Sequence, residues 1–327
     1  MSNLLEIKNL NKVFVSRKSK TKAVNNVSLS LPGDKPITLA VVGESGSGKS
    51  TLANLVLDFI RPTSGQILYQ GKDLSALKGK EHNAYRREVQ AIFQNPFDAY
   101  NPFYTVDHAF KQVFDHFDFS LSKEEQRALV EENLRLVKLD PSQVLGKYSY
   151  QMSGGQLQRI LVARALLLKP KLLIADEPVS MIDASLRVTV LDVMVRLKKE
   201  LGISQLYITH DLSTALQISD EIIVMYKGCV VESGRAEDVI LHPVHPYTQL
   251  LIQSIPIASP EEKWQDAPAA EENKNPQAGQ EACCFSHRCP YYNSQCAKGQ
   301  PELIPWKGDH KVSCYRYQNS PGKENGS

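Results

Sequence analysis

The chain has 327 residues, of which 42% are hydrophobic and 23% charged, and its formal net charge is +2 at pH 7. This length accommodates one large α/β domain with a smaller unit beside it, and the composition is that of a soluble globular protein. The small net charge gives no reason to expect a nucleic-acid partner or an anionic-membrane surface. No window holds the run of about eighteen apolar residues that a membrane-spanning helix requires. The N-terminus lacks a signal peptide, so we expect a cytoplasmic chain.

The N-terminal part predicts strands that lead into a glycine-rich loop. LLEIKNL and KVFV predict two strands, and the basic run at 16–22 predicts a solvated loop before the next strand. The run ITLAVVG at 37–43 is almost continuously apolar, as in a strand buried on both faces of a parallel sheet. It leads directly into the glycines, and residues 50–60 then predict an amphipathic helix.

Helical and strand patterns alternate through the rest of the first 255 residues. The segment 96–150 predicts a helical lobe, in which Ser122 and Glu125 have the spacing of a capping box. Further strands are predicted at 89–94, 171–178 and 204–211, helices at 153–170 and 184–202, and a hairpin that turns at Lys227–Gly228. The alternation predicts an α/β fold with a doubly wound parallel sheet.

Residues 43–51, GESGSGKST, match a phosphate-binding loop in its strand–loop–helix context. The glycines let successive N–H groups converge on phosphate oxygens, and the helix N-terminus adds a favourable dipole. We expect Lys49 to bridge the terminal phosphates, the Ser50 hydroxyl to bind Mg²⁺ and Thr51 to lie near the inner phosphate. The predicted nucleotide-binding residues here are Gly43, Glu44, Ser45, Gly46, Ser47, Gly48, Lys49, Ser50 and Thr51.

Polar residues at three other predicted strand ends complete a hydrolytic site. Asp176 and Glu177 end an apolar strand at the edge where ligands collect in open α/β sheets. Asp176 is placed to hold the metal, and Glu177 to deprotonate the attacking water. Gln94 can reach the metal and the water, and His210 can donate to the γ-phosphate. The predicted catalytic residues are Lys49, Gln94, Glu177 and His210, and the predicted Mg²⁺ ligands are Ser50, Gln94 and Asp176.

The segment SGGQ predicts a second anion cradle. It combines a serine able to cap a helix with two glycines that expose their amides at the helix N-terminus. Because the phosphate loop already supplies the contacts on its own side, this cradle is expected to serve a nucleotide bound to another subunit. Its residues are Ser153, Gly154, Gly155 and Gln156.

These motifs occur in a fixed order and together resemble those of ATP-binding cassette (ABC) ATPases over residues 1–255. The resemblance implies a P-loop NTPase core with an N-terminal β-subdomain and a helical subdomain at about 95–165. It also implies a head-to-tail dimer with ATP between the phosphate loop of one subunit and SGGQ of the other. On this basis Phe14 matches the aromatic that stacks on adenine, and His210 the γ-phosphate sensor. SMID at 180–183 replaces the commoner SALD of the loop that crosses the dimer and keeps Asp183.

The C-terminal part resembles a narrower group, the ATPases of oligopeptide/dipeptide importers. HPVHPYTQLL at 242–251 carries this resemblance, together with a polar linker at 256–281, a cysteine-rich module at 282–317 and a polar tail at 318–327. Such tails bind a [4Fe–4S] cluster through four cysteines. The matching residues are Cys283, Cys289, Cys296 and Cys314, with Cys284 as an alternative first ligand.

The residues alone leave the metal open. Four thiolates suit Zn²⁺ or a cubane cluster equally, His287 and His310 could substitute as ligands, and unligated cysteines are a further alternative. Cys229 stands apart from the cluster in the sequence.

The resemblance implies an ATP-hydrolysing, energy-coupling subunit of a peptide importer. Its expected partners are a second, related but different ABC ATPase, two membrane permease subunits and, indirectly, an extracytoplasmic solute-binding protein. The chain would then lie at the cytoplasmic face of the membrane. The aromatic-rich segment 95–106 could be the permease socket or the core of the helical lobe. Alternatives are an importer for oligosaccharides or nickel, and a soluble ABC ATPase in iron–sulfur or nucleic-acid processes.

Overall fold

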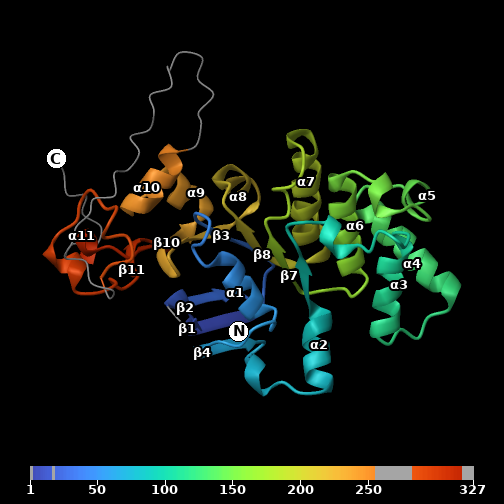
Figure 1. Cartoon of the computed structure of the whole chain (residues 1–327), viewed down its shortest axis with the longest axis horizontal. Coiled ribbons are helices and arrows are strands. Elements are labelled where there is room, and N and C mark those ends of the chain that lie inside the picture. The colour runs from blue at the N-terminus through green and yellow to red at the C-terminus, as the bar shows by residue number, and fades with distance from the viewer. Residues whose placement is uncertain (1–2, 17–18, 255–281, 319–327) are drawn as a thin grey trace, which may run out of the picture.

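The computed structural model describes residues 3–16, 19–254 and 282–318. Its helices and strands are arranged around two sheets, with a helical lobe at one end of the long axis and the cysteine-rich module at the other (Figure 1). The predicted linker at 256–281 and the polar tail beyond residue 318 lie outside the described residues.

Within the described residues, the larger sheet has eight strands in the order β11-β12-β10-β9-β3-β8-β7-β6. The strands from β9 to β6 are parallel, whereas β10, β12 and β11 extend the sheet in antiparallel fashion. Every residue of β3 and β8 is buried, as the apolar run before the phosphate loop predicted. The strands are β3 (Thr38–Val42), β6 (Val89–Ile92), β7 (Leu172–Asp176), β8 (Ser204–Thr209), β9 (Glu221–Tyr226), β10 (Cys229–Arg235), β11 (Ile304–Lys307) and β12 (His310–Val312).

The smaller sheet is antiparallel, with the order β2-β1-β4-β5. The two strands predicted before the basic run form one continuous strand. At Asn9, which takes a positive φ of 46°, the pairing shifts its register, but the strand does not end there. The predicted solvated loop is also shorter than expected, since β2 already starts at Lys20. These strands are β1 (Leu5–Val15), β2 (Lys20–Leu31), β4 (Ser64–Tyr69) and β5 (Lys72–Asp73).

Helices cover the larger sheet and form the lobe (Figure 1). The predicted capping box is confirmed at the start of α4, where Ser122 and Glu125 each accept the other's backbone N–H, at 3.2 and 2.7 Å. The α-helices are α1 (Lys49–Val56), α2 (Lys80–Glu88), α3 (Asp107–His116), α4 (Lys123–Leu136), α5 (Pro141–Val144), α6 (Gly154–Leu166), α7 (Ala184–Leu201), α8 (Leu212–Ile218), α9 (Ala236–Leu241), α10 (Pro246–Gln253) and α11 (Tyr315–Gln318). Short 3₁₀ turns are η1 (Leu74–Ala76), η2 (Phe97–Ala99), η3 (Ser149–Gln151) and η4 (Ser294–Ala297).

The cysteine-rich module is joined to the larger sheet by main-chain pairing and by one buried carboxylate. β12 pairs with β10 at the sheet edge. Glu232 of β10 is fully buried and accepts the backbone N–H groups of Val244 and His245, at 2.8 and 2.9 Å. It also contacts His310 Nε2 of β12 at 2.6 Å. Buried carboxylates require such partners, so this group fixes the module to the domain.

The apolar core continues from the sheet into the module. One cluster of buried side chains combines Val42 of β3 with Tyr226, Tyr247, Phe285 and three cysteines of the module, Cys283, Cys289 and Cys296. Among the described residues, no helix is long and apolar enough to cross a membrane.

Candidate nucleotide-binding site

The phosphate loop is packed so closely against the rest of the chain that two of its positions require glycine. Gly43 has φ 151°, and a Cβ there would lie 2.1 Å from the carbonyl oxygen of Met225. Gly48, the N-cap residue of α1, has φ 103° and would meet the carbonyl oxygen of Ala23 at 2.1 Å. Only glycine adopts these positive φ values without strain and allows such an approach. The loop between β3 and α1 is therefore held in shape by β9 and β2.

Lys49 lies buried inside this loop with 5% of its surface exposed. Its Nζ donates to the carbonyl oxygens of Gly43 and Glu44, at 2.7 and 2.9 Å. Burial lowers the pKa of Lys49, and the carboxylates of Glu177, Asp176 and Glu44 oppose that shift. The Lys49 ammonium would bind an anionic phosphate oxygen more strongly than these neutral carbonyl oxygens, because hydrogen bonds between opposite charges are stronger.

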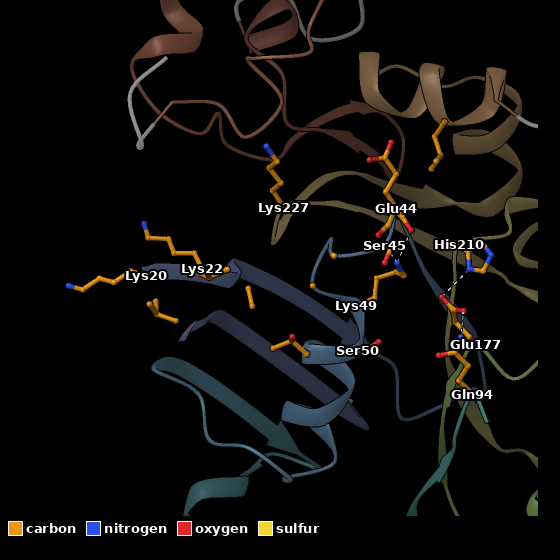
Figure 2. A pocket seen from close by; sticks show the side chains of 18 residues that line it. Lys20, Lys22, Glu44, Ser45, Lys49, Ser50, Gln94, Glu177, His210 and Lys227 are labelled. Carbon is orange, nitrogen blue, oxygen red and sulfur yellow. Dashed lines mark hydrogen bonds and ion pairs between the residues drawn. The ribbon is translucent and has the colours of Figure 1, made fainter. Parts of the chain in front are cut away.

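Three predicted catalytic residues meet at one carboxylate. Glu177 Oε2 accepts a hydrogen bond from Gln94 Nε2 at 3.0 Å, and Oε1 contacts His210 Nδ1 at 3.0 Å (Figure 2). Gln94 follows β6, Glu177 follows β7 and His210 follows β8, so three neighbouring parallel strands end at this point. Glu177 has a positive φ of 47°, and its N–H donates to the carbonyl oxygen of Ile208 at 2.8 Å. A side chain at such a φ costs energy, and positions of this kind cluster at functional sites.

Asp176 has the features of a magnesium ligand. Its Oδ1 is buried and has no hydrogen-bond partner within the described residues. Burial raises the pKa of Asp176, and a hydrogen bond from the Ser50 hydroxyl lowers it. A buried carboxylate oxygen without a donor, next to a hydroxyl, fits Mg²⁺, which takes oxygen ligands and offsets their charge. The structure thus brings the predicted ligands Ser50 and Asp176 together, while Gln94 lies nearby on Glu177.

The loop and the strand ends open into a cavity of about 1550 Å³. Lysines line one side of it, and Gln94, Glu177 and His210 the other, with Lys49 between them (Figure 2). Clustered positive charge in a cleft attracts polyanions such as nucleoside triphosphates. The lining residues are Val13, Lys20, Thr21, Lys22, Ala23, Gly43, Glu44, Ser45, Gly46, Gly48, Lys49, Ser50, Thr51, Gln94, Glu177, His210, Lys227 and Leu251.

Lys20, Lys22 and Lys227 of this lining were not anticipated as site residues. Lys20 and Lys22 belong to the basic run that was expected to be solvated, and Lys227 lies in the hairpin turn after β9. The basic run was a usable signal, but only the fold of β2 beside the phosphate loop shows that it faces the cavity.

Phe14, the residue predicted to stack on adenine, lies next to Lys12 in the structure. The Phe14 ring is 44% exposed, and Lys12 Nζ lies 5.2 Å from its centre. The adjacent residue Val13 lines the cavity, whereas Phe14 is not part of the described lining. The role of Phe14 in adenine stacking stays a prediction.

The second anion cradle lies apart from the first. Ser153 caps α6, since its Oγ accepts the N–H of Gln156 at 3.2 Å and Gln156 Oε1 accepts the N–H of Ser153 at 2.9 Å. Gly154 and Gly155 pack near Met181 and Leu186, and these four cradle residues are not part of the described cavity lining. Asp183 is exposed at the start of α7 and makes no capping hydrogen bond. One chain therefore does not bring SGGQ to its own phosphate loop.

The cysteines of the module lie close together, and Cys229 joins them. Cys283, Cys289 and Cys296 are buried in one apolar cluster. Burial, together with the charges of Cys296 and Cys283, raises the pKa of Cys289 to about 11. Burial, with the charges of Cys289, Cys283 and Cys296, likewise raises the pKa of Cys314 to about 12.

Cys284 makes different contacts from the other thiols of the module. Its thiol hydrogen-bonds to Cys229 and Cys283, and the contact with Cys229 is the main cause of its raised pKa. Cys229, which stands apart in the sequence, is therefore a neighbour of the module in the fold.

A metal site is not shown by this arrangement. Within residues 3–16, 19–254 and 282–318, no group of three or more His, Cys, Asp or Glu side chains is placed to hold one metal ion. His310 contacts Glu232, and His287 lies 3.2 Å from the Tyr226 hydroxyl and 2.7 Å from Lys227 Nζ. The predicted iron–sulfur or zinc module is thus not established, and the substitute histidines have other partners.

Comparison with known proteins agrees with the fold and with the nucleotide site. The family described as ABC transporter matches residues 24–180, and the family described as oligopeptide/dipeptide transporter, C-terminal region, matches residues 231–296. The dimeric ATP-binding cassette MJ0796, solved in a post-hydrolysis state with ADP and Pi, is similar at 26% identity with a TM-score of 0.63. The match covers 71% of this chain and 98% of that one.

Curated relatives cover almost the whole chain. The oligopeptide transport ATP-binding protein OppF of Escherichia coli (strain K12) is 38% identical over 95% of this chain and 92% of its own length. The dipeptide transport ATP-binding protein DppF of the same organism is 39% identical over 90% of this chain and 86% of its own. The chain belongs to the ABC transporter ATPases of the oligopeptide/dipeptide importer type.

Replacing Glu177 by Gln should separate hydrolysis from binding. The amide keeps the size of the side chain but cannot accept a proton, so steady-state ATP turnover should fall by about a hundred- to ten-thousand-fold. Nucleotide affinity, measured by calorimetry, should stay within a few fold because the phosphate contacts remain. Glu200→Gln, at an exposed ion pair with Arg196 on α7, is the matched control and should turn over normally. Turnover of Glu177→Gln at the wild-type rate would contradict the role of general base.

Proposed function

We propose that this chain drives the uptake of peptides by hydrolysing ATP in complex with membrane permease subunits. One observation carries the choice of peptide. The region matched by the oligopeptide/dipeptide transporter family, residues 231–296, continues from the nucleotide-binding fold into the cysteine-rich module. Relatives named for oligopeptide and dipeptide transport match about nine tenths of the chain or more, so they share both parts.

The hydrolytic roles follow from the contacts in the cavity. Lys49 exchanges the carbonyl oxygens of Gly43 and Glu44 for phosphate oxygens. Ser50 and Asp176 would hold Mg²⁺, which neutralises developing charge on the phosphates. Glu177 takes the proton of the attacking water, while Gln94 and His210 orient its carboxylate. His210 is then placed to donate to the γ-phosphate.

The test is whether transport substrate accelerates hydrolysis in the assembled importer. The chain should be co-purified with its permease and partner ATPase subunits, reconstituted in liposomes and supplied with the cognate solute-binding protein. A mixture of di- and oligopeptides should raise the ATPase rate and accumulate inside. The Glu177→Gln complex, under the same conditions, should bind ATP without accumulation. Stimulation by an oligosaccharide or by Ni²⁺, with none by peptides, would replace peptide as the substrate.

We further propose that each ATP is hydrolysed between two subunits, the second being a related but different ABC ATPase. Support comes from the placement of the SGGQ segment and Asp183, which are exposed or self-capping and lie away from the chain's own cavity. A second subunit placed head to tail would bring its SGGQ amides to the phosphates in this cavity.

Ser153→Arg tests this arrangement. A large cation at the cradle should block closure on the partner's nucleotide, so ATP hydrolysis by the assembled complex should fall by about tenfold or more. Binding of ATP to the isolated chain should not change, because Ser153 is outside its cavity. Ser122→Arg is the matched control, since Ser122 makes the same capping box at α4. If Ser153→Arg abolishes binding to the isolated chain, SGGQ belongs to the chain's own pocket.

The surface between the sheet and the helical lobe is the proposed contact for a permease helix. A groove of about 560 Å³ is lined by apolar side chains, such as Phe59, Phe93 and Phe117, and by charged and polar ones, such as Arg86 and Arg164. In the neighbouring segment 95–106, Tyr100 and Val106 are buried in the lobe core, whereas Phe103 is 86% exposed. Residues of this segment are thus found both in the lobe core and on an exposed surface, so the structure supports both interpretations of it, lobe core and permease socket. Exposed aromatic side chains around a groove are typical of helix-binding sites.

For the cysteine-rich module we propose an iron–sulfur cluster bound by Cys283, Cys289, Cys296 and Cys314. Beyond the effect of burial, the charge of Cys283 and its neighbours raises the pKa of Cys289 and of Cys314, so positive charge near these thiols would be stabilising. In the part of the chain that the structure describes, no three such side chains are placed to hold one metal ion. The ligands of a cubane bind different iron atoms and so lie farther apart, which favours a cluster over Zn²⁺. Cys284 hydrogen-bonds to Cys229, which stands outside the proposed ligand set, and also to Cys283. When bound, the cluster would cross-link a segment with little core of its own.

Metal analysis of the complex purified without oxygen tests this assignment. We expect iron and acid-labile sulfide in the wild type and the loss of both in Cys289→Ser, because a hydroxyl is a poor iron ligand. Cys229→Ser should retain iron, since that thiol is outside the proposed ligand set. Stoichiometric zinc, or protein without either metal, would contradict the cluster.

A further inference from the structure

An arginine of the cysteine-rich module reaches the phosphate loop. Arg288 NH1 contacts both carboxylate oxygens of Glu44, at 3.1 and 2.9 Å. The two residues are 244 positions apart in the sequence. The Arg288 guanidinium also lies 5.8 Å from the ring of Tyr226 and 5.9 Å from the ring of Phe285. These aromatic faces orient it toward Glu44, because cations bind favourably above aromatic rings.

The same loop residue is fixed by a second C-terminal contact. The backbone N–H of Glu44 donates to the hydroxyl of Tyr247, a fully buried residue of α10, at 2.8 Å. The main chain of Glu44 is therefore held by α10 and its side chain by the module. Of the two contacts, with Tyr247 and with Arg288, only the one with Arg288 pairs opposite charges.

The charge of Glu44 matters because the residue borders the phosphate site. Its carbonyl oxygen accepts from Lys49 Nζ at 2.9 Å, and its carboxylate acts electrostatically on Lys49. A carboxylate released in this position would compete with the γ-phosphate for the lysine and would repel the nucleotide. With 40% of its side chain exposed, Glu44 has room to turn.

We propose that Arg288 is a positioning residue of the nucleotide site, which holds the Glu44 carboxylate toward the module and away from Lys49 and so strengthens ATP binding. The proposal rests on ATP occupying the phosphate loop as described above. Arg288 precedes Cys289 directly, so the guanidinium and a proposed cluster ligand share one stretch of the module backbone. Nucleotide affinity is in this way coupled to the state of the cysteine-rich module.

A double-mutant cycle in the full-length chain tests the charge contact. Binding of the non-hydrolysable analogue AMP-PNP with Mg²⁺ is measured by calorimetry. Arg288→Ala should weaken it about three- to tenfold, the effect of one partly screened charge near a bound anion. In a Glu44→Gln background the same substitution should change affinity by less than about twofold, because no carboxylate is left to be held.

Two further variants separate charge from packing. Arg288→Met removes the charge but keeps the apolar contacts with Tyr226 and Phe285, so it should weaken nucleotide binding as much as Arg288→Ala. If Arg288→Ala folds poorly, Arg288→Met supplies the test. Arg316→Ala is the matched control, because this guanidinium lies 3.8 Å from the Tyr291 ring in the same module. Its nucleotide affinity should be that of the wild type.

The outcomes are distinguishable from failure of the nucleotide site itself. If Lys49→Ala binds like the wild type, the site is misassigned. If Lys49→Ala loses binding while Arg288→Ala and Arg288→Met do not, only the positioning role is wrong. A loss in Arg288→Ala that persists unchanged in the Glu44→Gln background also overturns it, since the effect would then be structural.

Discussion

The chemistry of this protein depends on parallel strands that end at the same edge of one sheet. β3 leads into the phosphate loop, and β6, β7 and β8 are followed by Gln94, Asp176–Glu177 and His210. The hydrogen-bonded register of the strands fixes the distance between these ends, so residues more than a hundred positions apart meet at one carboxylate. Loops supply the functional groups, but the sheet determines where they lie.

This edge concentrates groups that are costly to bury. Lys49 is almost fully buried, Asp176 has a carboxylate oxygen without a donor, and Glu177 takes a positive φ. The buried charges of Lys49 and Asp176 become favourable when a phosphorylated nucleotide and a divalent cation occupy the cavity, because opposite charges then pair in a partly dry site. The SGGQ cradle is built differently: its serine and glutamine satisfy each other, and it is not part of the described cavity lining. The proposed division of the site between two subunits would couple chemistry to their approach.

The C-terminal module packs as part of the nucleotide-binding domain. Its β12 strand extends the larger sheet beyond β10, and Glu232 binds His310 in a fully buried position. Tyr247 and Arg288 then contact a single residue of the phosphate loop. The module is thus joined to the phosphate loop by a short contact between opposite charges, Arg288 and Glu44.

The sequence by itself determined the local chemistry: the glycine loop with Lys49, the apolar strands before each functional residue, the capping box at Ser122, the helix-capping serine at Ser153 and the alternation of strand and helix. These features depend on neighbours within a few residues, and backbone propensity and hydrophobic period record them directly. The family resemblance rests on the same motifs. Only the tertiary structure decided that Val13 and not Phe14 lines the cavity, that Lys20 and Lys22 face it, that Cys229 joins Cys284 and that Arg288 reaches Glu44. Such contacts arise when distant segments pack together, and no local pattern encodes the distance between them.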